Sequence, residues 1–317
     1  METVACDLCR SKEFSLIFEV KDYITGTLQK VVRCKECDLA YVNPRPNPEE
    51  LSDFYPQNYY GENPFFYEKL DALLRFWELR KTIKKGDFIL DIGCGRGLLL
   101  SKLKHIGCKV WGTELSEISS RYAKENLKIN VISRNLEDCM FDKDYFDVVT
   151  MFHSLEHMMS PMETTREIYR ILKPEGTLII ELPRFNSLYA SIFRDKWFHL
   201  DVPRHLYHFS DSTIGKLLAS AGFNIVKEKH HALMYDSFGC LQSTLNYLCA
   251  KQNLLNDLNT KRITLSAIIK SKEMRLILDS VISLGLQSIL FIPFTAVAFI
   301  LSSLNIGGTL AVHAKKR

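Results

Sequence analysis

Two pairs of cysteine residues near the N-terminus have the type and the spacing of a metal site. Cys6 and Cys9 form one C-x2-C pair, Cys34 and Cys37 form another, and 24 residues separate the pairs. Each pair can form a tight turn whose two thiolates point at one ion, and four thiolates close a tetrahedral shell without an open position. The spacing therefore predicts a structural zinc ion in a zinc-ribbon-like module. The alternative interpretation is two pairs of buried or free cysteines.

A glycine-rich stretch, FILDIGCGRGLLL, is a second candidate for chemistry. Gly93, Gly95 and Gly97 let the backbone pass close to a ligand that a Cβ atom would exclude, at the positive end of the helix that follows. The G-x-G-x-G spacing differs from the dinucleotide fingerprint, whose third glycine would fall on Leu98. A second strand ends at Glu114, about twenty residues after the turn, where a carboxylate can accept hydrogen bonds from both hydroxyls of a ribose.

These candidates need a sheet to position them, and the pattern of the chain predicts one. Short apolar segments alternate with helical patterns between residues 86 and 230. After the strands of the glycine turn and of CKVWGTEL, a third strand ends at Asn135 and Leu136. The fourth and fifth lie in FDVVTMFHSLEHM and RILKPEGTLIIELP. Such alternation predicts an α/β fold with a doubly wound parallel sheet.

Residues 86–230 resemble a class I S-adenosylmethionine-dependent methyltransferase. The resemblance is carried by D-I-G-C-G-x-G, by L-E-H and by the later PRHLYHFS and AGFNIV. These motifs are similar to the branch that contains small-molecule and sugar methyltransferases, where a cysteine head joined to an NPRP linker also occurs. The resemblance implies S-adenosylmethionine as the cofactor and a Rossmann-like, seven-stranded sheet in the order 3-2-1-4-5-7-6.

The same resemblance implies which residues bind the cofactor. In that family Asp91 and the three glycines match the motif that holds the methionine part, and Glu114 matches the ribose ligand. Asn135 and Leu136 match the adenine-contacting pair, although the family more often has Asp where this chain has Asn135. The remaining cofactor-binding candidates are Leu115, Phe152 and His153, the last through its backbone.

Two histidines are candidates for the catalytic base. Methyl transfer is an in-line displacement at a sulfonium carbon, so the enzyme must align the nucleophile and, for a hydroxyl, remove its proton. Histidine has a pKa suited to a base near neutral pH. We therefore predict His157, in the L-E-H motif, and His205, in PRHLYHFS, as catalytic residues. A purely structural role is the alternative for each.

The C-terminal part contains no Lys, Arg, Asp or Glu between Asp279 and Lys315. Its last segment, GGTLAVHAKK, fits the seventh strand that the family implies, so residues 232–305 are predicted to be an insertion between strands six and seven. Both ends of such an insertion lie on one side of a membrane, and Pro293 divides the apolar run into pieces too short for two spans. We expect a re-entrant or interfacial helical hairpin and peripheral membrane contact through residues 276–304. A buried cap or a dimer contact is the alternative.

Composition sets the wider expectations. The 317 residues are 46% hydrophobic, and 41 basic against 37 acidic side chains argue against a dedicated nucleic-acid binder. The N-terminus lacks the apolar stretch of a secretory signal, so we predict a cytoplasmic protein at the cytoplasmic face of a membrane. The predicted segments are a zinc-ribbon-like module (1–42), a linker with helices (43–85), the cofactor-binding domain (86–231), the helical insertion (232–305) and the final strand (306–317).

The expected function is methyl transfer to a small-molecule acceptor, with a hydroxyl of a saccharide or lipid-linked glycan as the first candidate. The alternatives are a quinone-like O-methyltransferase and an RNA methyltransferase whose zinc head binds RNA. Against RNA, the loop MFHSLEH lacks the Asn/Asp-Pro-Pro-Tyr type of sequence used on base amines, and the head is not notably basic. A dinucleotide-dependent oxidoreductase and a non-catalytic cofactor scaffold are further alternatives. Neither the acceptor nor the oligomeric state follows from the sequence.

Overall fold

The computed structural model describes residues 1–55, 59, 66–230 and 232–316, and these divide into two compact units. Residues 183–213, assigned by sequence to the cofactor-binding domain, belong to the first unit together with the cysteine head. The first unit comprises Met1–Gly61, Pro183–Thr213 and Lys229–Leu310, and the second comprises Glu62–Leu182, Ile214–Glu228 and Ala311–Arg317.

The first unit contains a four-stranded sheet in the order β1-β2-β3-β9, in which each neighbouring pair is antiparallel. A core cluster that includes Val31, Val42 and Trp197 packs beneath it. Short helices follow β3 and also lie within the 183–213 segment. The elements are β1 (Phe14–Lys21), β2 (Leu28–Cys34), β3 (Ala40–Val42), α1 (Pro48–Leu51), η1 (Ser52–Phe54), α6 (Leu188–Phe193), η4 (Arg194–Lys196), η5 (Phe198–Leu200) and β9 (Tyr207–His208).

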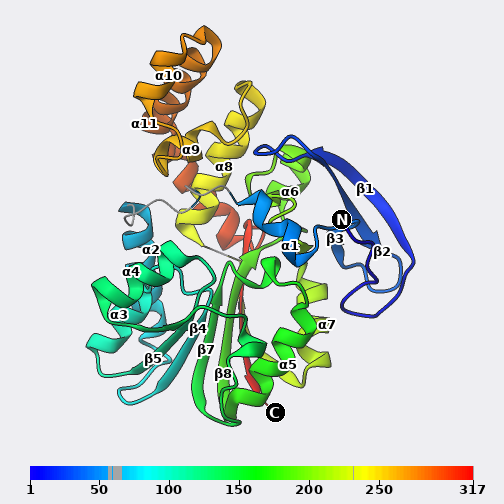
Figure 1. Ribbon diagram of the computed structural model, residues 1–317, viewed down its shortest axis with the longest axis vertical. Coiled ribbons are helices and arrows are strands. Elements are labelled where there is room, and N and C mark those ends of the chain that lie inside the picture. The colour runs from blue at the N-terminus through cyan, green and yellow to red at the C-terminus, as the bar shows by residue number, and fades with distance from the viewer. Residues whose placement is uncertain (56–58, 60–65, 231, 317) are drawn as a thin grey trace. The chain divides into compact units, whose positions relative to one another are not determined.

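The predicted hairpin in the hydrophobic insertion is wrong, because one helix, α11, runs unbroken through Pro293. Packing explains this. Phe291 and Phe294, on either side of the proline, join a cluster with Leu241 and Leu245 of α8, and this burial outweighs the roughly 3 kcal/mol cost of an interior proline. The insertion, drawn from yellow to orange-red in Figure 1, consists of α8 (Leu233–Leu248), α9 (Leu254–Asn259), α10 (Leu265–Ser271) and α11 (Met274–Ser303).

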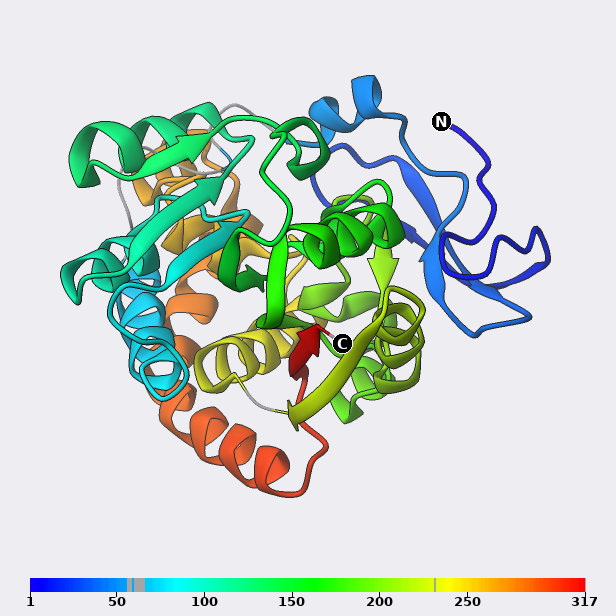
Figure 2. The ribbon, with the colours of Figure 1, turned by 90° about the horizontal axis from the view of Figure 1, so that it is seen from below.

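The second unit is built on a seven-stranded sheet in the order β10-β11-β8-β7-β4-β5-β6. With these seven strands numbered in chain order and read from β6 to β10, this is the predicted order 3-2-1-4-5-7-6, and the insertion does join the sixth strand to the seventh. The order and the place of the insertion are therefore confirmed. Figure 2 shows β11 running opposite to its neighbour β10. The strands are β4 (Phe88–Ile92), β5 (Lys109–Thr113), β6 (Asn130–Ile132), β7 (Phe146–Phe152), β8 (Leu172–Pro183), β10 (Phe223–Lys229) and β11 (Thr309–Lys316).

Helices of the second unit bury one apolar face each against this sheet. Leu99, Leu100 and Leu103 of α3 are buried in a cluster with Ile89 of β4 and Val131 of β6, as the helical spacing of these leucines requires. β4 pairs in parallel with β5 and with β7, so their carboxyl ends meet at one edge. The helices are α2 (Phe66–Leu79), α3 (Leu98–His105), α4 (Glu117–Leu127), η2 (Leu136–Asp138), η3 (Leu155–His157), α5 (Pro161–Ile171) and α7 (Asp211–Ser220), which begins in the first unit.

Candidate cofactor site and cysteine cluster

The glycine turn between β4 and α3 is closed on one side and open on the other. Gly93, Gly95 and Gly97 have φ angles of 71°, 53° and 69°, in the left-handed region that favours glycine. A Cβ atom on Gly93 would lie 2.3 Å from the Oγ atom of Ser154, whereas one on Gly95 would meet no atom of the described residues within 4 Å. A ligand can therefore approach the backbone at Gly95, beside the N-terminus of α3.

Glu114 is fixed next to this turn by two backbone amides. Its Oε2 atom accepts a hydrogen bond from the amide of Gly95 at 2.9 Å, and its Oε1 atom accepts one from Ser116 at 2.7 Å. Burial raises the pKa of the carboxyl group, while the same two amides act in the opposite direction. Because each carboxylate oxygen has two lone pairs, acceptor positions remain for a pair of ribose hydroxyls.

Asp91 lies at the end of β4 and is buried. Its Oδ1 atom accepts a hydrogen bond from the hydroxyl of Thr150 on β7 at 2.7 Å. Burial raises the pKa of Asp91 to about 7, and the Thr150 hydrogen bond only partly offsets this. A cationic ligand beside Asp91 favours the ionised form, so this carboxyl group suits a cofactor that carries positive charge.

The other predicted cofactor residues follow the ends of the neighbouring strands. Leu115 comes after β5 and is 63% exposed, and Leu136 is buried at the start of η2. The side chain of Asn135 is exposed. Phe152 ends β7, and the guanidinium of Arg75 lies 4.2 Å from its ring centroid. These residues therefore gather at the carboxyl edge of the sheet, where open α/β sheets bind their ligands.

His153 is held between two carboxylates. It has a left-handed backbone with a φ of 52°. Its Nε2 atom lies 3.1 Å from Glu181 and its Nδ1 atom 3.6 Å from Glu156. Burial alone would lower the pKa of His153, but hydrogen bonds to the two carboxylates outweigh it and raise the pKa to about 9. The imidazole is therefore cationic at neutral pH, and its side chain as well as its backbone shapes this site.

Arg75 is a residue that the sequence did not single out. It lies on α2, and its Nη2 atom donates to Glu181 at 2.8 Å while its Nε atom lies 3.0 Å from Asp71. Glu181 thus connects Arg75 with His153. More than a hundred residues separate Arg75 from Glu181, and helical periodicity places both Asp71 and Arg75 without showing what they face. Only the tertiary structure reveals this network.

The two predicted bases lie in different units. His157 ends η3 in the second unit and is half-buried. His205 is buried in the first unit, where its Nδ1 atom lies 2.8 Å from the carbonyl oxygen of His199. Because a carbonyl oxygen can only accept, a neutral imidazole at this position carries its proton on Nδ1 and its lone pair on Nε2. That tautomer suits a base acting through Nε2.

The four head cysteines come together as the spacing predicts. Their sulfur atoms all lie within 4.8 Å of one another, with 3.4 Å between those of Cys6 and Cys37 and between those of Cys9 and Cys34. All four are free thiols. Burial raises the pKa of Cys37 to about 11, so the thiolate form needs a nearby cation. The donor set fits a tetrahedral, thiolate-binding metal ion.

Both cysteine turns share one backbone geometry. The residues that follow the pairs, Arg10 and Asp38, have φ angles of 63° and 69°. Their amides donate to the carbonyl oxygens of Cys6 and Cys34 at 2.8 and 3.1 Å. A non-glycine residue with positive φ is uncommon, and two at equivalent positions indicate that the surrounding structure requires the turn.

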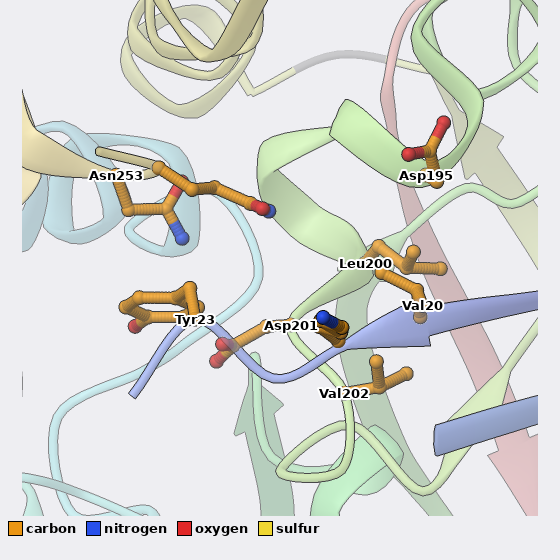
Figure 3. A pocket seen from close by; sticks show the side chains of 9 residues that line it. Val20, Tyr23, Asp195, Leu200, Asp201, Val202 and Asn253 are labelled. Atoms are coloured by element: carbon orange, nitrogen blue, oxygen red, sulfur yellow. The ribbon is translucent and has the colours of Figure 1, made fainter. Parts of the chain in front are cut away.

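A small pocket in the first unit is lined by Val20, Lys21, Tyr23, Asp195, Leu200, Asp201, Val202, Gln252 and Asn253 (Figure 3). Its polar side chains make internal bonds. Asp201 pairs with the buried Arg204 at 2.8 Å, and the Tyr23 hydroxyl accepts from Arg262 at 3.1 Å. These bonds engage the carboxylate of Asp201 and the hydroxyl of Tyr23 inside the protein, and we assign this pocket no ligand.

The parallel sheet, the glycine turn and the acid after the second strand together define a Rossmann-like cofactor-binding domain. The sequence model of a family described as "Methyltransferase domain" matches residues 62–228, more than half of the chain. The chain belongs to this family and is a class I S-adenosylmethionine-dependent methyltransferase.

Several curated proteins are similar to part of the chain. The ubiquinone biosynthesis O-methyltransferase of Coxiella burnetii is 33% identical over 110 residues, which are 33% of this chain and 47% of that protein. A protein of the same description from Nitrosospira multiformis is 28% identical over 153 residues, 44% of this chain and 64% of that protein. The chain thus spans about half the length of the first of these relatives.

Among solved structures, that of the cyclase SpnF is similar with a TM-score of 0.50 and 17% sequence identity, over 80% of this chain and 83% of that one. A likeness at this identity supports the fold alone, since one fold carries many reactions.

Proposed function

We propose that this methyltransferase transfers its methyl group to a hydroxyl of a small lipophilic acceptor, with a phenol of the quinone-precursor type as the first candidate. The observation that carries the proposal is the similarity to proteins described as ubiquinone biosynthesis O-methyltransferases. That similarity covers only 33% and 44% of this chain, so the acceptor is a matter for experiment.

The chain's own residues supply the binding and the alignment. S-adenosylmethionine, when bound, supplies an electrophilic methyl group on a sulfonium. Glu114, already oriented by the amides of Gly95 and Ser116, would accept hydrogen bonds from the ribose hydroxyls. Asp91 would balance positive charge at the end of β4, and the open side of the glycine turn would take the methionine part.

Substituting two acidic residues that lie close together in the sequence, Glu114 and Glu117, tests the cofactor site. Glu114→Gln removes the charge of the buried carboxylate, and Glu117→Gln changes an exposed one in the first turn of α4. Isothermal titration should show at least a tenfold loss of S-adenosylmethionine affinity for the first and little change for the second. Equal affinities of both variants for S-adenosylmethionine would show that Glu114 does not bind the cofactor.

His157 and His205 are proposed as alternative bases that take the proton of the acceptor hydroxyl. The tautomer fixed by the His199 carbonyl favours His205. Replacing the base by Gln should lower turnover about a hundredfold while cofactor affinity stays unchanged. If both variants keep the wild-type rate with the true acceptor, neither histidine is the base.

A panel of acceptors decides the substrate class. Methyl transfer from labelled cofactor is measured with catechol-type quinone precursors, nucleotide sugars and lipid-linked saccharides, with Glu114→Gln as the background control. A hydroxyl of a saccharide or lipid-linked glycan is the second candidate, supported by the L-E-H, PRHLYHFS and AGFNIV motifs shared with sugar methyltransferases. Turnover of saccharides without turnover of phenols would replace the first candidate by the second.

We also propose a structural zinc ion bound by Cys6, Cys9, Cys34 and Cys37. Purified protein should contain about one equivalent of zinc under reducing conditions. Cys34→Ser should lose it and lower the melting temperature, whereas Cys139→Ser, outside the cluster, should keep both. Wild-type protein without zinc, or a Cys34→Ser variant that retains it, would contradict this assignment.

A further inference from the structure

Helix α11 has an unusual distribution of side chains for a protein in water. The positions buried along it are Asp279, Ser280, Ser283 and Ala298, three of which are polar. The exposed positions include a row of large apolar side chains, which we call the outer stripe: Leu278, Val281, Ile289, Ile292, Phe299 and Ile300. Asp279, Ser280 and Ser283 therefore lie on the inner side of α11, beside apolar residues that pack on α8, while the outer stripe is exposed.

Contacts with α8 explain the inward-facing polar groups. The Oδ2 atom of Asp279 accepts a hydrogen bond at 2.8 Å from the amide of Ala250, just beyond α8. The hydroxyl of Ser283 lies 3.5 Å from the sulfur of Cys249. These bonds, with the apolar cluster around Leu241 and Leu245, fix which side of α11 faces α8 and the rest of the first unit. The orientation of the outer stripe follows from them.

The outer stripe is long and carries no charge. Its members recur mainly at spacings of three, seven or eight residues, which places them on one face of a helix. From Leu278 to Ile300 this face extends for about 33 Å at 1.5 Å per residue. Exposed apolar surfaces of this size mark contacts with a membrane or another protein.

Basic side chains lie at one end of the stripe. Lys270, Lys272 and Arg275 are exposed around the start of α11, with Glu273 as the exposed acid among them. Arg275 also contacts the buried Asp279 at 3.2 Å. Apolar side chains beside a positively charged cluster are complementary to acyl chains beside anionic headgroups. A second copy of the chain would offer the same positive cluster and no such complement.

The length and composition of α11 would allow it to cross a membrane, and among the described helices it alone has both. Its partner argues against crossing. α8 is bonded to the 194–200 segment, where Ser243 accepts from the amide of Phe198 at 2.9 Å and Asn246 donates to the carbonyl of Lys196 at 3.0 Å. A spanning α11 would draw this segment, which includes Arg194 and Asp195, to hydrocarbon depth at a high energetic cost.

We propose that α11 lies flat in the interface of an anionic lipid bilayer, with the outer stripe at the acyl-chain boundary and Lys270, Lys272 and Arg275 among the headgroups. This attachment is independent of the acceptor. It also does not depend on methyl transfer, so the Glu114→Gln variant should bind lipid like the wild type.

Vesicle co-sedimentation of the full chain tests the proposal. Vesicles of phosphatidylcholine with phosphatidylglycerol should bind the protein. Vesicles of pure phosphatidylcholine should bind it at least about threefold more weakly. The double variant Ile292→Glu/Ile300→Glu should lose at least about tenfold in affinity for the anionic vesicles. Val226→Glu on β10 is the matched control, because Val226 and Ile300 are both 57% exposed. Circular dichroism checks that each variant is folded.

Four outcomes would overturn the proposal. The first is a wild-type protein that does not sediment with anionic vesicles, and the second is equal sedimentation of the double variant and the Val226→Glu control. Protein that stays in cell membranes after carbonate extraction would span the bilayer and would exclude the flat arrangement. A double variant that turns a dimer into a monomer, with unchanged lipid binding, would assign the outer stripe to a contact between copies.

Discussion

Helix α3 of the second unit and helix α11 of the first distribute their side chains in opposite ways. α3 buries Leu99, Leu100 and Leu103 against the sheet and exposes Lys104 and His105. α11 buries Asp279, Ser280 and Ser283 and exposes its outer stripe. The first arrangement is that of a helix between an apolar core and water.

The difference teaches that the two helices have different surroundings. For α3 the apolar medium is the interior of the second unit. For α11 the inner face packs on α8 through the hydrogen bond to Asp279 and through an apolar cluster, and the proposed apolar medium for the outer stripe is a lipid bilayer. Substitutions in the sheet region and in the insertion should therefore have different effects on stability, and the following predictions compare them.

The largest expected effect contrasts one apolar residue from each helix. Leu100→Ala should lower the free energy of unfolding by about 2–5 kcal/mol, because it leaves a cavity in the core of the second unit. Ile292→Ala, at a position that is 78% exposed, should change it by less than about 0.5 kcal/mol. Urea denaturation without detergent measures both. Similar losses would mean that Ile292 is covered in solution and would break the comparison.

The next effect concerns the buried charges of the sheet region. The pKa of His153 is raised from 6.5 to about 9 by Glu156 and Glu181 after burial has lowered it. Between these two values the folded protein binds a proton that the unfolded chain does not. Stability is therefore fully present below pH 6.5 and is lost as the pH rises through 9, by at most about 3 kcal/mol.

Urea denaturation from pH 6 to pH 9.5 measures this dependence. His153→Gln should remove most of the decline, whereas the exposed His105→Gln should keep it. Parallel pH profiles for the wild type and His153→Gln would show that His153 does not bind this proton.

A smaller effect separates two glycines of the cofactor turn. Gly93→Ala should destabilise the protein by about 2 kcal/mol, since a positive φ is strained for alanine and its Cβ would displace the buried Ser154. Gly95→Ala should cost about 1 kcal/mol from φ alone. Its Cβ, however, would enter the open side of the turn and weaken cofactor binding. Thermal unfolding and titration calorimetry should thus rank the two variants differently, and a common ranking would argue against an open cofactor face at Gly95.

The smallest effect tests the inward polar face of α11. Asp279→Ala leaves the amide of Ala250 without its side-chain acceptor and should cost about 1 kcal/mol. Glu273→Ala changes an exposed acid six residues earlier, at the N-cap of α11, and should cost less than half of that. If the two variants are equally stable in urea, Asp279 does not hold α11 against α8.

Much of the fold follows from local patterns and from a family resemblance. Alternating apolar segments predicted the parallel sheet, and the order of its strands was confirmed because the final GGTLAVHAKK segment does join the sheet as β11. The cysteine spacing predicted a cluster whose sulfurs do lie together. The roles of the cofactor residues and of the two histidines stay predictions.

Other features of the site depend on contacts that no local pattern contains. Arg75 and Glu181 meet across the second unit, and nothing in the spacing of α2 distinguishes Arg75 from Lys69, the other basic residue of this helix. The left-handed turns at Arg10 and Asp38 also have no glycine to predict them. In each case the partner in space, rather than the residue type, decides the conformation.

The apolar C-terminal part shows which features the sequence alone does not determine. The sequence by itself determined that residues between Asp279 and Lys315 carry no charge and that the tail ends in a strand. It predicted a helical hairpin divided at Pro293, which is wrong, and it did not show which face of the helix would point inward. Tertiary structure decided both features. Packing on α8 offsets the cost of Pro293, and this packing together with the hydrogen bond from Ala250 to Asp279 fixes the inward face of α11.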